Sequence, residues 1–357
     1  MTYKQGFRRA LTARAVAPKG YPTRRAGGTT PMTHIPTYAD IQDAAKRLKG
    51  MAARTPLLEA HVMGAASGCR LFVKPEVLQR TGSFKFRGAY NRIGRLDEAE
   101  RKRGVVAYSS GNHAQGVAAA ATLVGAPSVI VMPSDAPAIK VANTKALGGE
   151  VVLYDRFKES REEIGQRIAS ERGLTLVKPY DDPYVIAGQG TAGLELVEQA
   201  KEMGASPDIV VSPCGGGGLV AGCALAVKES LPDAIVYGAE PAGLDDTARS
   251  LAFGQRVSNN PKATTICDAL MAPMPGEITF EVNRKLLKGA IAVSDDEVLS
   301  AMKRAFLDLK LVVEPGGAVA LAAVLSGKID VRGKTVAVVC SGGNVDPAMF
   351  ERALKAS

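Results

Sequence analysis

The sequence of 357 residues contains no tryptophan, only three histidines and five cysteines, and no long hydrophobic run. Three histidines, at positions 34, 61 and 113, are too few for a histidine-rich metal centre. The cysteines are odd in number and scattered, without a C-x-x-C pair, so they indicate neither a disulfide framework nor a zinc site. No apolar run approaches the roughly 18 residues that a membrane-spanning helix needs. These absences predict a globular protein of the reducing cytoplasm with no membrane partner.

Acidic residues are absent from residues 1–31, and this segment accounts for most of the net charge of +9. It carries seven lysines and arginines, namely Lys4, Arg8, Arg9, Arg14, Lys19, Arg24 and Arg25. The charge of the remaining chain is therefore close to balanced, which argues against a nucleic-acid partner. We interpret residues 1–33 as a basic, disordered tail that precedes the ordered protein.

From about residue 38 onward, segments with the pattern of helices alternate with segments with the pattern of strands. Apolar runs of strand length occupy residues 69–76, 104–110, 128–133, 150–155, 208–214, 234–241 and 334–343. Helix-like segments occupy residues 38–52, 112–125, 136–149, 157–173, 185–204 and 219–230. This alternation predicts βαβ units and an α/β fold with mainly parallel sheets. Because such sheets bind ligands at the carboxyl ends of their strands, function is expected in the loops that follow the strands.

One lysine, in the stretch RTGSFKFRGAY, has neighbours that suit a reactive amine. Residues 81–83 read as a turn ending in an N-cap, with a helix starting at Phe84, so Lys85 falls in the first turn. The helix dipole there disfavours a cation, and Phe84 and Phe86 are expected to desolvate the ammonium. Both effects lower the pKa of Lys85. The alternative is an ordinary surface lysine.

Three loops after strands carry small or polar residues. SSGNH, residues 109–113, opens a helix whose free N–H groups suit a carboxylate or phosphate. The four glycines 215–218 let the backbone approach a ligand closely and can form an anion-binding nest. CSGGN, residues 340–344, suits the floor of a pocket.

Two further interpretations involve Glu240. The pattern Gly216-x-Gly218-x-x-Ala221 matches a dinucleotide fingerprint, with Glu240 placed as its ribose-binding acid. That interpretation predicts an NAD-linked oxidoreductase but leaves Lys85 and the SSGNH loop without a role. Glu240 and Asp246 also lie close in sequence and could hold Mg²⁺ or another hard cation.

Together, an amine, a phosphate cradle and a polar loop match the needs of one aldehyde cofactor, pyridoxal phosphate (PLP). The motifs TGSFKFRGA, SSGNHAQG, VIAGQGT, CGGGGL, GAEPAGLDD and SGGN resemble, in the same order, those of the fold-type II PLP enzymes. The resemblance is to the serine/threonine dehydratase (ammonia-lyase) and serine racemase family and runs from about residue 38 to residue 350. It implies two open, mainly parallel twisted sheets flanked by helices, as in the tryptophan synthase β fold, with the cofactor between two domains. The large domain would comprise residues 34–106 and 184–357, and the small, substrate-closing domain residues 107–183.

The resemblance also implies a role for each matching residue. Lys85 would form the Schiff base with the cofactor and remove the α-proton, and Ser341 would contact the pyridine nitrogen. Further cofactor contacts would come from Phe84, Asn112, Gly215, Gly216, Gly217, Gly218, Leu219 and Glu314. The substrate carboxylate would bind to the loop formed by Ser109, Ser110, Gly111, Asn112 and His113, and a divalent cation to Glu240, Leu244 and Asp246.

These roles predict a homodimeric dehydratase that converts L-threonine or L-serine type 3-hydroxy amino acids to 2-oxo acids and ammonia. Ser110 keeps an alternative open, because it matches the second acid/base of the racemases, on the face opposite Lys85. A serine racemase-like activity is therefore the second hypothesis, and an NAD-linked oxidoreductase is less favoured.

Overall fold

The computed structural model describes residues 34–356 of the chain. The interpretation of residues 1–33 as a disordered basic tail lies outside the described residues. Residues from His34 onward form one unit, so the division into a large and a small domain remains a prediction. No helix within residues 34–356 is both long and apolar enough to cross a membrane.

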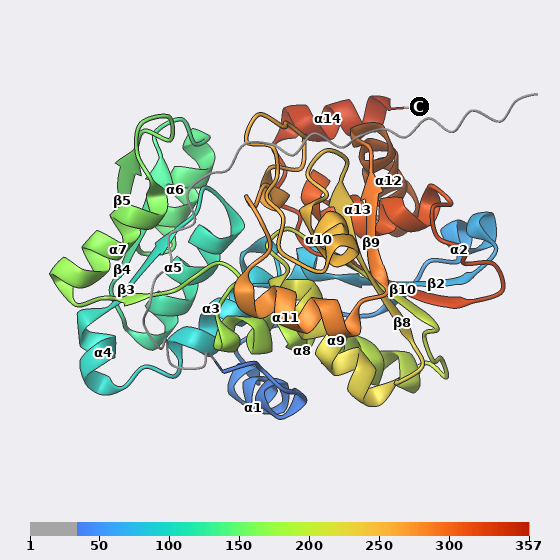
Figure 1. Cartoon of the computed structure of the whole chain (residues 1–357), viewed down its shortest axis with the longest axis horizontal. Coiled ribbons are helices and arrows are strands. Elements are labelled where there is room, and N and C mark those ends of the chain that lie inside the picture. The colour runs from blue at the N-terminus through green and yellow to red at the C-terminus, as the bar shows by residue number, and fades with distance from the viewer. Residues whose placement is uncertain (1–33, 357) are drawn as a thin grey trace, which may run out of the picture. The chain divides into compact units, whose positions relative to one another are not determined.

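A six-stranded sheet forms the larger half of the fold (Figure 1). Its strand order is β1 (Leu58–Glu59), β2 (Arg70–Pro75), β10 (Thr335–Cys340), β7 (Ile209–Pro213), β8 (Ile235–Pro241) and β9 (Gly289–Val293). Every neighbouring pair is parallel except β1 and β2. The carboxyl ends of β7 and β10 therefore lie at the same edge, which brings the glycine loop and the CSGGN loop together.

A second, four-stranded sheet is entirely parallel and has the order β5 (Gly149–Tyr154), β4 (Ser128–Pro133), β3 (Val105–Tyr108) and β6 (Thr175–Leu176). Alternate residues of β3 point to opposite faces, as the pleat requires. Val105 and Ala107 join the core on one face, and Val106 joins the core on the other. Apolar residues are needed on both faces because helices cover both, which explains the unbroken apolar runs in the sequence.

The helices flank both sheets (Figure 1). Their bounds are α1 (Tyr38–Leu48), α2 (His61–Ser67), α3 (Lys85–Ile93), α4 (Glu98–Arg103), α5 (Asn112–Val124), α6 (Ala138–Ala146), α7 (Arg161–Arg172), α8 (Pro183–Glu202), α9 (Gly218–Ser230), α10 (Asp246–Phe253), α11 (Glu277–Leu286), α12 (Asp295–Leu309), α13 (Pro315–Leu325) and α14 (Pro347–Lys355). Short 3-10 turns span Glu76–Leu78, Arg80–Gly82 and Asp268–Leu270. The expected α/β architecture with two mainly parallel sheets is confirmed.

Candidate active site

One cavity brings together loops that are far apart in the sequence. Its walls come from the start of α3, the loop after β3, the loop between β7 and α9, the segment after β10 and the chain between β6 and α8. All of the residues expected to contact the cofactor or the substrate line it, namely Phe84, Lys85, Ser109, Ser110, Gly111, Asn112, His113, Gly215, Gly216, Gly217, Gly218, Leu219, Glu314 and Ser341. The parallel topology of the six-stranded sheet places the ends of β7 and β10 at one edge, and the loop after β3 comes to them from the four-stranded sheet.

Lys85 is the first residue of α3, and its side chain is desolvated. Burial lowers the pKa of Lys85 to about 8, although the nearby Glu314 carboxylate opposes the shift. The Nζ atom donates a hydrogen bond to the carbonyl of Pro179 (2.7 Å) and lies 5.1 Å from the centre of the Phe84 ring. The predicted reactive amine therefore has its expected surroundings, apart from Phe86.

Two local details of the sequence prediction are wrong. Ser83 does not cap the helix; it is extended and buried and forms a β-bridge with Gly342, while Phe84 occupies the N-cap position. Phe86 does not desolvate the ammonium, because it lies in the core and stacks on Tyr90 at 5.6 Å. A residue one position further along a helix is rotated by about 100°, so Phe86 faces away from Lys85.

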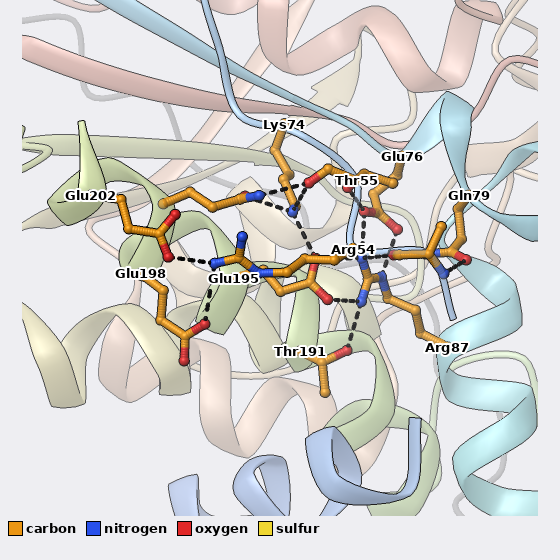
Figure 2. A network of polar contacts seen from close by, with 12 residues as sticks. Arg54, Thr55, Lys74, Glu76, Gln79, Arg87, Thr191, Glu195, Glu198 and Glu202 are labelled. Atoms are coloured by element: carbon orange, nitrogen blue, oxygen red, sulfur yellow. Dashed lines mark hydrogen bonds and ion pairs between the residues drawn. The ribbon is translucent and has the colours of Figure 1, made fainter. Parts of the chain in front are cut away.

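A buried ion network anchors α3 through Arg87, two residues after Lys85 in the sequence (Figure 2). Arg87 is fully buried and donates to both carboxylate oxygens of Glu76 (2.7 and 2.8 Å) and to Glu195 (2.7 and 2.8 Å). Lys74, also fully buried, donates to Glu195 at 2.7 Å. Two cations and two carboxylates balance, so the network orients α3 without leaving an unpaired buried charge.

Asn112 and Glu314 meet on the floor of the cavity. Asn112 Nδ2 donates to Glu314 Oε1 at 2.5 Å, and Asn344 Nδ2 donates to Asn112 Oδ1 at 2.8 Å. Burial raises the pKa of Glu314 to about 7, and the Asp268 carboxylate adds to the rise. Ser341 lies at the end of β10 and is almost fully buried beside the same cavity.

The glycine loop is supported from behind by α11. The hydroxyl of Thr279 donates to the carbonyl of Gly216 (2.7 Å), and Asn283 Nδ2 donates to the carbonyl of Gly217 (3.4 Å). In a trans peptide the N–H points opposite to the carbonyl, so the N–H groups of Gly217 and Gly218 face away from α11. Together with the free N–H groups of the first turn of α9, they form a cradle for an anion.

The loop before α5 offers a second anion site. Ser109, Ser110 and Gly111 precede the helix, and Gly111 is its N-cap residue. His113 does not present a charge there, because burial and the nearby Lys85 lower its pKa to about 3. Its Nε2 donates to the carbonyl of Val177 at 2.9 Å, which ties α5 to the chain after β6.

Glu240, Leu244 and Asp246 lie outside this cavity. Both carboxylates are fully buried, and burial raises the pKa of Glu240 to about 8 and that of Asp246 to about 6. Glu240 accepts hydrogen bonds from the backbone N–H groups of Thr247 and Ala248 at 2.9 Å, and because it does not line the cavity it cannot bind a ribose there. Within residues 34–356, no three His, Cys, Asp or Glu side chains gather as metal ligands. A cation site of two carboxylates and a carbonyl remains a prediction.

Several residues that line the cavity were not expected from the sequence. They are Tyr108, Lys140, Arg161, Pro179, Tyr180, Gln189, Pro213 and the segment 268–272. Lys140 pairs with Asp268 at 2.7 Å, and the ring of Tyr180 occupies the space that a side chain at Gly216 would need. Only the VIAGQGT motif carried a signal for any of them, since it contains Gln189.

The residues present fit a PLP molecule. They supply an amine with a lowered pKa, an anion cradle at a helix N-terminus, and polar groups between the two. The model of the family described as "Pyridoxal-phosphate dependent enzyme" matches residues 48–342. The chain belongs to this family of PLP-dependent enzymes, within its ammonia-lyase and racemase group.

Individual relatives agree with this assignment. The chain is 45% identical to an L-threo-3-hydroxyaspartate ammonia-lyase from a Pseudomonas species, over 90% of this chain and 99% of that protein. It is 43% identical to the L-threonine ammonia-lyase of Thermotoga maritima, over 88% of this chain and 77% of the other. The solved structure of maize serine racemase matches with a TM-score of 0.84 and 40% identity, covering 90% of this chain and 97% of that one.

Proposed function

We propose that this protein is a PLP-dependent ammonia-lyase that converts L-threonine, L-serine and related 3-hydroxy amino acids to 2-oxo acids and ammonia. The observation that carries the proposal is the desolvated Lys85 amine, which lies in one cavity with two separate anion sites. One site suits the cofactor phosphate, and the other suits the substrate carboxylate.

When bound, PLP supplies an electron-withdrawing ring that acidifies the Cα–H bond of the substrate. Lys85, as the neutral amine, removes that proton. The N–H groups at the start of α5, beside Ser109 and Gly111, hold the substrate carboxylate and so orient the Cα–H bond. The β-hydroxyl departs with a proton as water, and addition of water to the unsaturated product releases the 2-oxo acid and ammonia. Ser341 lines the cavity and would offer the cofactor ring a neutral hydroxyl in place of a carboxylate, which would favour elimination over transamination.

The cavity also supports a substrate with a second carboxylate, such as 3-hydroxyaspartate. Lys140 lies beside Gly111, because its Nζ is 3.8 Å from the position of a Cβ atom built there. Arg161 lines the same cavity. Each cation could pair with the additional carboxylate, which a methyl-bearing substrate lacks.

Racemisation is the second candidate, and Ser110 supports it. Its hydroxyl lines the cavity that contains Lys85. Racemisation needs one base on each face of Cα, whereas elimination needs Lys85 alone.

We infer that Glu240, Asp246 and the Leu244 carbonyl hold a divalent cation. Asp246 Oδ2 is buried and has no hydrogen-bond partner within residues 34–356. A bound cation would give the unpaired Asp246 oxygen a partner and would cancel the repulsion between the two carboxylates.

We also propose that the protein is a homodimer and is located in the cytoplasm. Sedimentation velocity tests the first prediction, and cell fractionation tests the second.

One assay separates the two activities. The 2-oxo acid and the D-amino acid are measured from the same L-substrate, with the wild type and Ser110→Ala, with and without Mg²⁺. We expect the 2-oxo acid to dominate in both proteins. A dominant D-product that Ser110→Ala abolishes would instead establish the racemase, and 2-oxobutyrate formation by Lys85→Ala would refute the mechanism.

A further inference from the structure

The two glycines in the middle of the VIAGQGT motif, Gly188 and Gly190, allow α8 to pack closely against its neighbouring helices. Gly188 abuts α3, since a Cβ there would lie 2.5 Å from the Arg87 carbonyl oxygen. Gly190 abuts α9 and would place a Cβ 2.8 Å from the carbonyl oxygen of Gly222. The two glycines thus wedge α8 between the helix that begins with Lys85 and the helix that begins at the glycine loop. Gln189, between them, is buried and lines the active-site cavity.

Gln189 is 1% exposed, and both its Nε2 and its Oε1 lack a hydrogen-bond partner within the part of the chain that the structure describes. A buried carboxamide with neither atom paired is costly and rare. An apolar side chain of similar volume, such as methionine, would fill the same space without the cost of an unpaired polar group. A glutamine at this position therefore indicates a hydrogen-bond partner that is absent from the structure.

The position of the carboxamide indicates what that partner is. Gln189 lines the active-site cavity, and its Oε1 lies 2.7 Å from the position of a Cβ built on Gly218, in the anion cradle. The side chains that support the cradle from α11, Thr279 and Asn283, donate to glycine carbonyls. Gln189 belongs to a different helix and borders the cavity itself. Because neither atom of its carboxamide is paired, a half-turn about the terminal side-chain bond brings the donor Nε2 to the place of Oε1, where it can donate to a bound anion.

We propose that the Gln189 carboxamide donates a hydrogen bond to the phosphate of PLP and so helps this protein to select the phosphorylated cofactor. Backbone N–H groups can hold any small anion at the start of α9. A side-chain donor beside Gly218 adds a contact that the unphosphorylated aldehyde cannot make. The inference rests on the cofactor of the family and not on which amino acid is the substrate.

The test compares two ligands in equilibrium dialysis of the full chain: PLP, and pyridoxal, which is the same aldehyde without the phosphate. Binding is read from the visible absorption of the protein-bound ligand. We expect Gln189→Ala to weaken PLP binding about 10- to 100-fold, as for loss of a hydrogen bond to a charged group. Pyridoxal binding should change by less than about twofold, since the lost contact is to the phosphate. Gln189→Glu should weaken PLP binding further, because it opposes one anion with another.

Gln199 supplies the matched control, because it lies on the same helix and is buried, but is fully bonded. Its Nε2 donates to the Thr55 carbonyl (2.9 Å), and its Oε1 accepts from Lys74 (2.9 Å). Gln199→Ala should lower the melting temperature while leaving the ratio of PLP to pyridoxal affinity unchanged. An equal loss of both affinities in Gln189→Ala would overturn the proposal, as would unchanged PLP affinity. If that variant does not fold, Gln189→Asn, shorter by one methylene, tests the same ratio.

Discussion

The lowered pKa of Lys85 makes a direct prediction about the protein freed of cofactor. Burial shifts the pKa of this lysine from its ordinary value to about 8. At pH 7 roughly 10% of the side chain would then be the neutral amine, against about 0.03% for a solvated lysine with a pKa of 10.5. Lys85 should therefore react about 300-fold more often than exposed lysines, if reactivity follows the neutral fraction.

The assay is competitive labelling of all lysines with a trace of a small acylating reagent between pH 6 and pH 11. Peptide mass spectrometry then reports the labelling of each lysine, and exposed lysines such as Lys102 provide the internal reference. We expect the labelling of Lys85 to rise with a midpoint near pH 8. A midpoint near the ordinary lysine value would refute the claim that burial prepares this amine.

A variant sharpens the test. The Glu314 carboxylate favours the ammonium form of Lys85 and holds its pKa up. Glu314→Gln should therefore move the midpoint of Lys85 labelling to lower pH. The shift should be clearest above about pH 7, where Glu314 is mostly ionised in the wild type. A midpoint that moves upward would show that the two groups do not interact as the structure indicates.

Three further predictions concern the surroundings of the site. Arg87→Met leaves the buried Glu76 and the partly buried Glu195 with one cation, Lys74, between them, so urea denaturation should show a loss of about 3–5 kcal/mol, against less than about 1 kcal/mol for the exposed Arg54→Met. Burial raises the pKa of Glu240 and Asp246, so the folded state binds more protons than the unfolded chain, and their contribution to stability falls as pH rises from about 4 to about 8. Thermal melts at pH 8 should therefore show Mg²⁺ stabilising the wild type but not Glu240→Gln/Asp246→Asn, whose melting temperature without cation should exceed that of the wild type. Lys140→Met should raise KM for 3-hydroxyaspartate more than KM for threonine in steady-state kinetics. An equal change in KM for both substrates would show that Lys140 does not select between them.

The local chemistry of the site could be predicted from the sequence because each part of it occupies a short stretch of chain. The turn before Lys85, the four glycines and the SSGNH loop are contiguous, and each follows a recognisable strand or begins a helix. The parallel topology then requires the loops after β3, β7 and β10 to lie at strand ends. The wrong predictions concern the conformation and the contacts of single residues near Lys85. Ser83 has the composition of an N-cap, but a β-bridge to Gly342 fixes it as extended chain.

The class of chemistry could be inferred from the sequence, since an amine and an anion cradle depend on residue type and on position next to a strand end or helix start. Which side chains share the cavity depends on the packing of distant segments. Tyr180 and Lys140 come from segments with no local signal of their own, and only the fold brings them to the cavity that Gln189 also lines. It also decided the electrostatics, because the lowered pKa of Lys85 arises from burial, which depends on contacts between residues far apart in sequence. Gln189 illustrates the difference. Its VIAGQGT motif is visible in the sequence, but that its carboxamide is buried and unpaired follows only from the packing of α8 between α3 and α9.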